Sequence, residues 1–220
     1  MIAALREMIS FLPPLLEGTR ITITVSAVAY LLSLVLGLLF GLGRIAPFWL
    51  VRWVAAAYVQ FFRGTPLLLQ LFFIYYIMPY AGVVLSPFTS GVMGLTINYS
   101  AYMAEVFRSG IQAIPPGQWA AAQSLGMSRS QLMRRIILPQ AIRVVIPPLG
   151  NFLVSIFKDS ALVSVITMRD LMFSGELLAS ATFKHFQIFA LVALIYFVIS
   201  YPLAKVVEHI EGRLDTSRNR

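Results

Sequence analysis

The stretch GQWAAAQSLGMSRSQLMRRIILPQA, residues 117–141, differs in character from the rest of the chain. It combines alanines, a central glycine, hydroxyl side chains and three arginines, and it contains no acid. The segments on either side of it are long and apolar. A short basic segment between apolar ones predicts a connection that leaves an apolar environment, and the composition of the whole chain indicates which environment that is.

The composition is typical of a membrane protein. Of 220 residues, 59% are hydrophobic and only 12% are charged, and the mean hydropathy is +0.81, so the chain cannot supply the polar surface of a soluble domain. Cysteine is absent, which excludes disulfides and cysteine-ligated metals. The net charge of +8 is spread among apolar segments, which favours a role in membrane orientation over nucleic-acid binding.

Five segments contain the roughly 20 apolar residues that a membrane-spanning helix needs. They are residues 21–43, 53–80, 87–111, 147–167 and 187–207. With these spans, twelve of the 17 Lys and Arg residues fall on one side of the membrane and four on the other, with Lys158 inside the fourth span. Basic loops are favoured in the cytoplasm. The sequence therefore predicts an external N-terminus, a cytoplasmic C-terminus and a single transmembrane domain over residues 1–220.

Two further segments are expected at the outer surface. Residues 1–18 contain Pro13 and Pro14 and lack the apolar run and cleavage site of a signal peptide, so we expect an external interfacial helix. Residues 167–186 alternate charged and apolar side chains, which predicts an amphipathic segment lying on the membrane. The stretch quoted above then falls in the longest cytoplasmic connection, residues 115–139.

This connection is expected to form a small cytoplasmic knob, a name used here for residues 115–139. A helix-forming run follows its prolines, Gly126 ends that run, and Ser128 can cap a second short helix. The second helix places Arg134 and Arg135 in its last turn, where the helix dipole favours cations. Two such short helices have little apolar face to bury within the loop, so we expect the knob to pack on another protein.

Part of the knob resembles a known loop. Ala121–Ala122, Gly126 and Ile137–Leu138–Pro139 follow one another in the order of the EAA loop of ABC importer permeases, in which a glycine and then an apolar-Leu-Pro ending follow a Glu-Ala-Ala motif. Four more segments resemble landmarks of permeases in the polar amino-acid uptake family. They are Arg63–Gly64–Thr65–Pro66–Leu67, Ala101–Tyr102–Met103–Ala104–Glu105, Pro147–Pro148–Leu149–Gly150–Asn151 and Lys158–Asp159–Ser160.

The resemblance implies an all-α ABC importer permease fold and a set of partners. These are a second permease, identical or homologous, two cytosolic ATPases that bind ATP and Mg, and an external solute-binding protein that delivers the substrate. The residues implied in contact with an ATPase are Ala120, Ala121, Ala122, Gly126, Ser128, Arg129 and Arg134. Ala120 departs from the family pattern, which has Glu there, so the strength and symmetry of coupling are open. The alternative for the whole segment is a basic topological anchor.

Two predicted spans carry polar side chains at helical spacing. They are Asn98, Tyr102 and Glu105 in the third span, and Asn151, Ser155, Lys158 and Asp159 in the fourth. Each set falls on one helix face. An ionisable group near the bilayer centre costs about 2.5–3.5 kcal/mol, so the two stripes predict a path for a zwitterion or cation. The alternative is that these residues pair with neighbouring helices and stabilise the bundle.

The second predicted span contains a possible break. Arg63 and Gly64 precede Thr65 and Pro66, and Thr as N-cap with Pro in the first turn favours the start of a new helix. A helix N-terminus beside an arginine can bind a substrate carboxylate, and Gln70, one turn on, would share that face. The alternative is that Arg63 reaches the headgroups and Pro66 lies in an ordinary first turn.

The chain itself carries no pattern for ATP hydrolysis. None of its three lysines follows the glycine of a phosphate-binding loop, and no metal-ligand or nucleophile motif occurs. These absences favour a transport subunit over an enzyme. The resemblance implies the permease of an ATP-driven, solute-binding-protein-dependent importer of polar amino acids in a bacterial cytoplasmic membrane. The alternatives are a secondary carrier driven by an ion gradient and a membrane enzyme acting on lipid headgroups.

Overall fold

The structure is a computed structural model that describes residues 2–216, with side chains described for residues 8–214. The described chain is helical apart from short connections and contains no strand. Its long helices are α1 (Ile2–Gly43), α2 (Trp49–Arg63), α4 (Pro87–Gln112), α7 (Leu138–Asp159) and α9 (His185–Thr216). Its short helices are α3 (Leu67–Phe72), α5 (Pro116–Ser124), α6 (Arg129–Leu132) and α8 (Leu171–Thr182), with π turns at Phe73–Ile77 and Met133–Ile137 and 3₁₀ turns at Met78–Ala81 and Ser160–Ile166.

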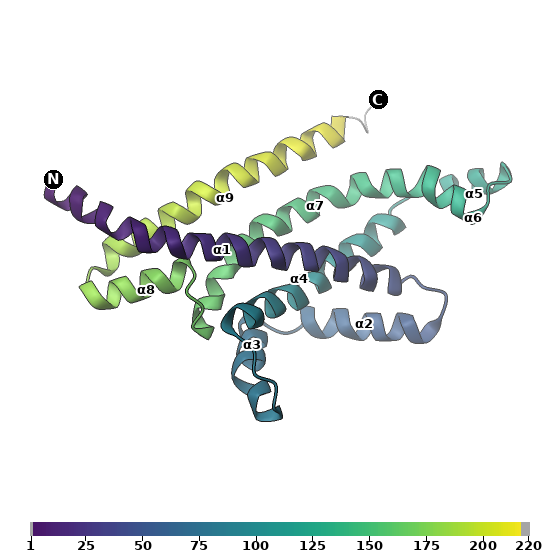
Figure 1. The fold of residues 1–220 in the computed structure, drawn as a ribbon. Helices are drawn as coiled ribbons and strands as arrows, with labels where there is room; N and C mark the ends of the chain where they lie inside the picture. Colours follow the sequence, from purple (N-terminus) through teal and green to yellow (C-terminus); the bar gives the residue numbers. More distant parts are fainter. Residues whose placement is uncertain (1, 217–220) are drawn as a thin grey trace.

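The core of the bundle lies where α1 runs along α4, with α7 packed beside them (Figure 1). Val25 and Ala29 of α1 belong to one buried apolar cluster with Leu95 and Met103 of α4 and Ile156 of α7. These residues recur at helical spacing on each element, so each helix turns one apolar face inward. The cluster fixes α4 and α7 next to each other, and the site described below lies between them.

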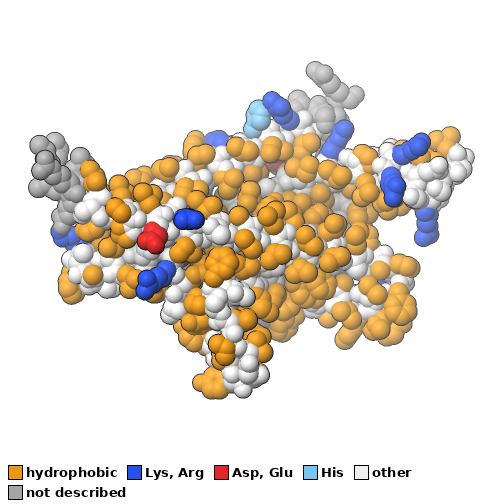
Figure 2. All heavy atoms as spheres, viewed as in Figure 1, with side chains coloured by type: hydrophobic (Ala, Val, Ile, Leu, Met, Phe, Trp, Pro, Cys, Tyr) orange, Lys and Arg blue, Asp and Glu red, His pale blue; other side chains and the backbone are white. Residues whose placement is uncertain are grey.

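The outer surface is also apolar. Figure 2 shows hydrophobic side chains over most of the visible face of the long helices, with Lys and Arg side chains gathered mainly towards the ends of the molecule. Leu31, Leu39 and Phe197 expose 62%, 60% and 59% of their surface. Large apolar areas of this kind mark a surface that contacts lipid or protein rather than water.

Three described helices are long and apolar enough to cross a membrane, namely Met8–Gly43, Arg129–Ile166 and His185–Leu214. A fourth candidate is the pair Trp49–Arg63 and Leu67–Ala81, which is bent by 102°. The expected span at 87–111 is present as α4, but its buried face carries Thr96, Asn98 and Ser100, which lower its apolarity. The count of five spans and the orientation therefore stay predictions.

The prediction of a separate helix over residues 1–18 is wrong. Helix α1 is continuous from Ile2 through Pro13 and Pro14 to Gly43. Phe11 and Leu15, one turn apart, are buried in a second apolar cluster with Leu171 of α8 and Ile188 of α9. This packing holds the proline-containing turns in helical conformation, while Met1 lies outside the described residues.

Residues 167–186 contain helix α8 with a tight turn at each end. Thr167 and Phe183 have left-handed φ values of 61° and 59° and bracket helix α8. Asp170 caps that helix by accepting hydrogen bonds from Met172 N and Phe173 N. Helix α8 has a buried face, as expected of an amphipathic segment, and that face packs on α1 and α9. Its place at the outer surface of the membrane stays a prediction.

Candidate functional site

The break in the second predicted span is confirmed, but its capping differs from the prediction. Helix α3 begins at Leu67, and Pro66 (φ −62°, ψ 136°) is the N-cap, with no side-chain hydrogen bond. Thr65, expected at the N-cap, lies one position earlier, and its hydroxyl donates to Phe61 O at 3.0 Å. The Thr65 hydroxyl thus closes the end of α2 rather than the start of α3.

Gln70 holds the two halves of this break together. Its side-chain nitrogen donates to Phe62 O (3.0 Å), Thr65 O (3.1 Å) and Thr65 Oγ1 (2.8 Å). The residue is only 7% exposed. Gln70 was expected along the substrate path, but its amide is directed at the backbone of the break, so it positions the neighbouring residues instead.

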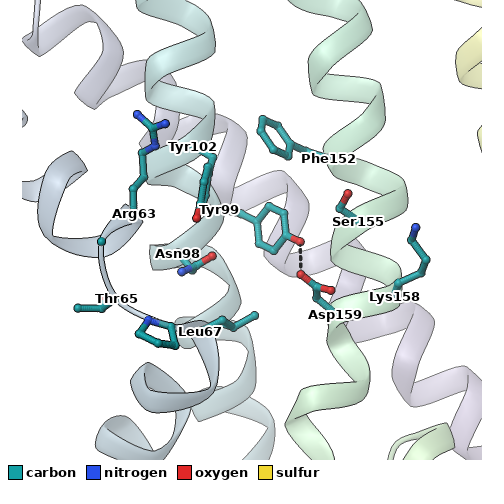
Figure 3. A pocket seen from close by; sticks show the side chains of 12 residues that line it. Arg63, Thr65, Leu67, Asn98, Tyr99, Tyr102, Phe152, Ser155, Lys158 and Asp159 are labelled. Atoms are coloured by element: carbon teal, nitrogen blue, oxygen red, sulfur yellow. Dashed lines mark hydrogen bonds between the residues drawn. The ribbon is translucent and has the colours of Figure 1, made fainter.

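A cavity of about 590 Å³ lies between this break, the middle of α4 and the end of α7. It brings together seven of the residues that the sequence suggested for a substrate path, and Figure 3 shows their side chains arranged around it. The seven are Arg63, Thr65, Asn98, Tyr102, Ser155, Lys158 and Asp159. Residues more than 90 positions apart in the chain therefore share one concave polar site.

Asp159 faces this cavity with one oxygen already bonded. The hydroxyl of Tyr99 donates to Asp159 Oδ2 at 2.6 Å, a contact drawn in Figure 3. The Tyr99 ring in turn lies edge-on to Phe152, with centroids 5.9 Å apart. Neither aromatic residue was predicted from the sequence, although each directly follows a polar residue of the stripes, Asn98 and Asn151. An aromatic neighbour one position along a helix still lies near the same face, and this could have indicated them.

Arg63 enters the cavity from the end of α2. Its guanidinium carbon lies 5.3 Å from the centroid of the Tyr102 ring, within the range of a cation–π interaction. Its Nη1 atom is 4.0 Å from Glu105 Oε2, which is long for a hydrogen bond. The guanidinium therefore keeps donor capacity for a ligand.

Three expected path residues do not line the cavity. Glu105 is bound to Arg44 of α1 and to Arg108 one turn along α4, with Arg108 Nε 3.1 Å from Glu105 Oε1. Asn151 is exposed on α7 and does not line the cavity. Gln70 is bonded to the backbone of the break, as described above. Glu105 therefore pairs with neighbouring arginines and stabilises the bundle, which was the alternative to a path residue. Asp159 both contacts a neighbouring helix and faces the cavity.

The knob has the predicted turn at Gly126. This residue has φ +69°, and Gly126 N bonds Gln123 O while Met127 N bonds Ala122 O, which is the Schellman ending of a helix. Ser128 then caps α6 in a capping box with Gln131, as expected from the sequence. Both local predictions are confirmed.

Two expectations for the knob are corrected. Arg134 and Arg135 do not end a separate helix, because they lie in the π turn Met133–Ile137 that runs directly into α7. Pro139 has no N–H to bond Arg135 O, which favours the widened turn. The knob also has an apolar core of its own, which includes Ala122 and Leu132.

The residues proposed for ATPase contact divide into two groups. Ala122 is buried in the core of the knob, so its side chain faces inward. The others are exposed, namely Ala120, Ala121, Gly126, Ser128, Arg129 and Arg134. Leu125 beside Gly126 is 81% exposed. The knob thus presents small, apolar and basic groups together, and its contact with a partner stays a prediction.

Comparisons with known proteins agree on one family. Residues 33–216 match the family described as "Binding-protein-dependent transport system inner membrane component". The chain is 42% identical to the probable glutamine ABC transporter permease protein GlnM of Bacillus subtilis (strain 168), over 92% of this chain and 94% of that protein. It is 35% identical to the glutamine transport system permease protein GlnP of Escherichia coli (strain K12), over 92% and 94%. It also resembles the crystal structure of an amino acid ABC transporter with histidines, with TM-score 0.90, 38% identity and coverage of 94% of this chain and 97% of that one.

Proposed function

The chain belongs to the family of inner membrane components of binding-protein-dependent transport systems, and on this premise we propose that it forms the translocation path of an ATP-driven importer of polar amino acids. The observation that carries the proposal is the cavity between α2, α4 and α7, which holds both cationic and anionic side chains. The ion-gradient carrier is not supported, because the matching relatives are ABC transporter permeases.

The cavity suits the two charges that every amino acid carries. Arg63 keeps donors for a carboxylate, since Glu105 is already bound by Arg44 and Arg108. Asp159 has one oxygen bonded by Tyr99 and keeps the other for an ammonium group. Asn98 and Tyr102 lie near the middle of α4, so the two charged groups would meet the substrate inside the bilayer, where such interactions are strong.

Energy would reach this site through the knob. In this proposal two cytosolic ATPases bind ATP and Mg, a second permease completes the path, and an external binding protein delivers the substrate. The exposed strip from Ala120 to Arg129 contacts one ATPase. Because α6 continues through the π turn into α7, movement of the knob is transmitted to the helix that carries Asp159.

Reconstitution tests the class of transporter. We expect this chain, assembled with its ATPase, second permease and binding protein in proteoliposomes, to take up amino acid only with ATP. The same chain alone, under a proton or sodium gradient, should take up none. Uptake by the chain alone would overturn the proposal in favour of an ion-gradient carrier.

Substitution of Gly126 tests the coupling. A β-branched residue in the left-handed region costs about 1–2 kcal/mol, so Gly126→Val should distort the knob and lower ATP-driven uptake and ATPase recruitment. Gly126→Asn should largely retain both, because Asn tolerates this conformation. Gly117→Ala is the matched control, since a Cβ there meets nothing within 4 Å and its φ is not positive. Normal recruitment and uptake with Gly126→Val would refute the coupling role.

A further inference from the structure

A second cavity lies at the knob end of the molecule, between α7, α9 and the end of α4. Its volume is about 630 Å³, so it is as large as the proposed substrate cavity. Its walls include Gln140, Arg143, Pro147 and Pro148 from α7 and Glu211 and Leu214 from α9. No residue of the substrate cavity lines it, so it is a separate site.

The cavity arises from the way α7 and α9 cross. A Cβ atom on Gly150 would lie only 2.8 Å from Val207 Cγ1, so the absence of a side chain at Gly150 lets the two helices touch there. Beyond this contact, towards the knob, α7 and α9 diverge (Figure 1). The cavity occupies the gap, and both of its main walls are continuous helices.

Two opposite charges on its walls, Arg143 and Glu211, have no counter-ion among the side chains that the structure describes. Among residues 8–214, whose side chains the structure describes, neither Arg143 nor Glu211 forms an ion pair. By contrast, Lys205 on the same helix as Glu211 pairs with Glu208. A cavity that presents an unpaired cation and an unpaired anion suits a ligand that brings both charges.

The depth of the two residues indicates where such a ligand comes from. Arg143 precedes the predicted span 147–167 by four residues, and Glu211 follows the predicted span 187–207 by four. At 1.5 Å per residue both lie about 6 Å beyond the hydrocarbon core, which is the headgroup layer of a bilayer. On the membrane side of Arg143 the cavity is lined by Val144, Pro147 and Pro148. These apolar side chains can contact the glycerol and the first acyl carbons of a lipid.

We propose that this cavity binds the headgroup of a phospholipid that carries a primary ammonium, with Arg143 on the phosphate and Glu211 on the ammonium. A guanidinium can donate two parallel hydrogen bonds to a phosphate, and a carboxylate accepts from an N–H group that a quaternary ammonium lacks. Basic pockets between membrane helices are a known setting for lipid headgroups. The bound lipid would link α7 and α9 next to the knob.

Lipid retention by the intact transporter tests the proposal. The complex is stripped with detergent and supplied separately with phosphatidylethanolamine, phosphatidylcholine and phosphatidylglycerol, and the lipid that stays bound is measured by native mass spectrometry. We expect phosphatidylethanolamine to be retained best. Arg143→Gln should weaken its retention about tenfold, and Glu211→Gln should remove the preference over phosphatidylcholine, because each removes one charge-assisted hydrogen bond.

Arg135→Gln and Glu208→Gln are the matched controls. Each removes the same charge from a nearby position that does not line the cavity, and we expect both to retain phosphatidylethanolamine like the parent. Equal retention of all three lipids by the parent, undiminished retention in Arg143→Gln, or an unchanged preference in Glu211→Gln would overturn the proposal. So would binding of soluble glycerophosphoethanolamine or free amino acid without lipid retention, which would make the cavity a site for a soluble zwitterion.

Discussion

Two groups of charged residues inside the helix bundle have similar chemistry and different surroundings. In the first, Glu105 is bound by Arg44 from α1 and Arg108 from its own helix. In the second, Asp159 and Lys158 face a cavity, and within residues 8–214 Asp159 accepts a side-chain hydrogen bond only from the neutral hydroxyl of Tyr99. Lys158 forms no ion pair with any residue from 8 to 214.

A charge at membrane depth either pairs with a neighbouring side chain or stays available to a ligand, and its packing decides which. Both groups carry the cost of placing ions away from water. In the Glu105 group the opposite charge comes from Arg44 on α1 and from Arg108 one turn along α4, so the group stabilises the ends of α1 and α4. In the Asp159 group the opposite charge is left for a ligand. Arg63 lies between the two groups, with Nη1 4.0 Å from Glu105 Oε2 and the guanidinium carbon 5.3 Å from the centroid of the Tyr102 ring.

The largest effect on stability is expected from Glu105→Gln. The change leaves Arg44 and Arg108, whose side chains are only 20% and 24% exposed, without a counter-charge. A loss of about 2 kcal/mol is expected, between the values for exposed and fully buried ion pairs. The thermal unfolding midpoint of the purified transporter should fall clearly, while the molecules that stay folded keep their affinity for substrate.

Glu208→Gln is the control for this prediction, because Glu208 forms an exposed pair with Lys205 on α9. Its unfolding midpoint should be close to that of the parent, since exposed pairs contribute about 0–1 kcal/mol. If Glu105→Gln unfolds like the parent and loses substrate affinity instead, Glu105 belongs to the substrate site and the two groups are not distinct.

Asp159→Asn should give the reverse pattern. The amide keeps the shape of the side chain and can still contact Tyr99, so the unfolding midpoint should change little. Loss of a charge-assisted hydrogen bond to an ammonium should raise the KM for uptake about tenfold or more. Asn151→Ala, on the same predicted stripe but outside the cavity, should leave uptake unchanged. An unaltered KM in folded Asp159→Asn would make Asp159 a structural residue.

Arg63 tests the boundary between the groups. If it serves the substrate, Arg63→Gln should raise KM by about tenfold, because a charged hydrogen bond to the carboxylate is lost. Its contribution to stability should stay below about 1 kcal/mol, since its contact with Glu105 is long and its side chain is 41% exposed. Arg63→Lys should recover part of the affinity but lose the contact of the guanidinium with the Tyr102 ring. A fall in unfolding midpoint equal to that of Glu105→Gln would assign Arg63 to the first group.

The part of the site that follows from local chemistry could be predicted from the sequence. Ser128 capping, the turn at Gly126 and the break after Gly64 depend on residues a few positions apart, and the structure contains all three. Ser155 and Asp159 were found for the same reason, because they share a helix face. The predicted N-cap, Thr65, is one residue too early, because α3 begins at Leu67 and its N-cap is Pro66.

The remaining residues could not be assigned because spacing on one helix does not show how far a cavity extends. Asn151 is eight residues from Asp159, or about 12 Å along the helix, and the cavity ends before it. Glu105 shares the stripe of Asn98, but its partner Arg44 comes from α1, 61 positions earlier in the chain. Which carboxylate meets an arginine and which meets open space is decided by packing between helices.

The smallest effect is expected from Tyr99→Phe. The change removes the hydroxyl that donates to Asp159 at 2.6 Å and keeps the ring packed against Phe152. Without this donor Asp159 can turn away from the substrate while keeping its charge, so KM should rise only about threefold to tenfold. In the Asp159→Asn background the same change should have a smaller effect, because Tyr99 acts through the carboxylate. Full additivity of the two changes would mean that Tyr99 meets the substrate directly, and the cavity would then recognise the ammonium group through two separate contacts.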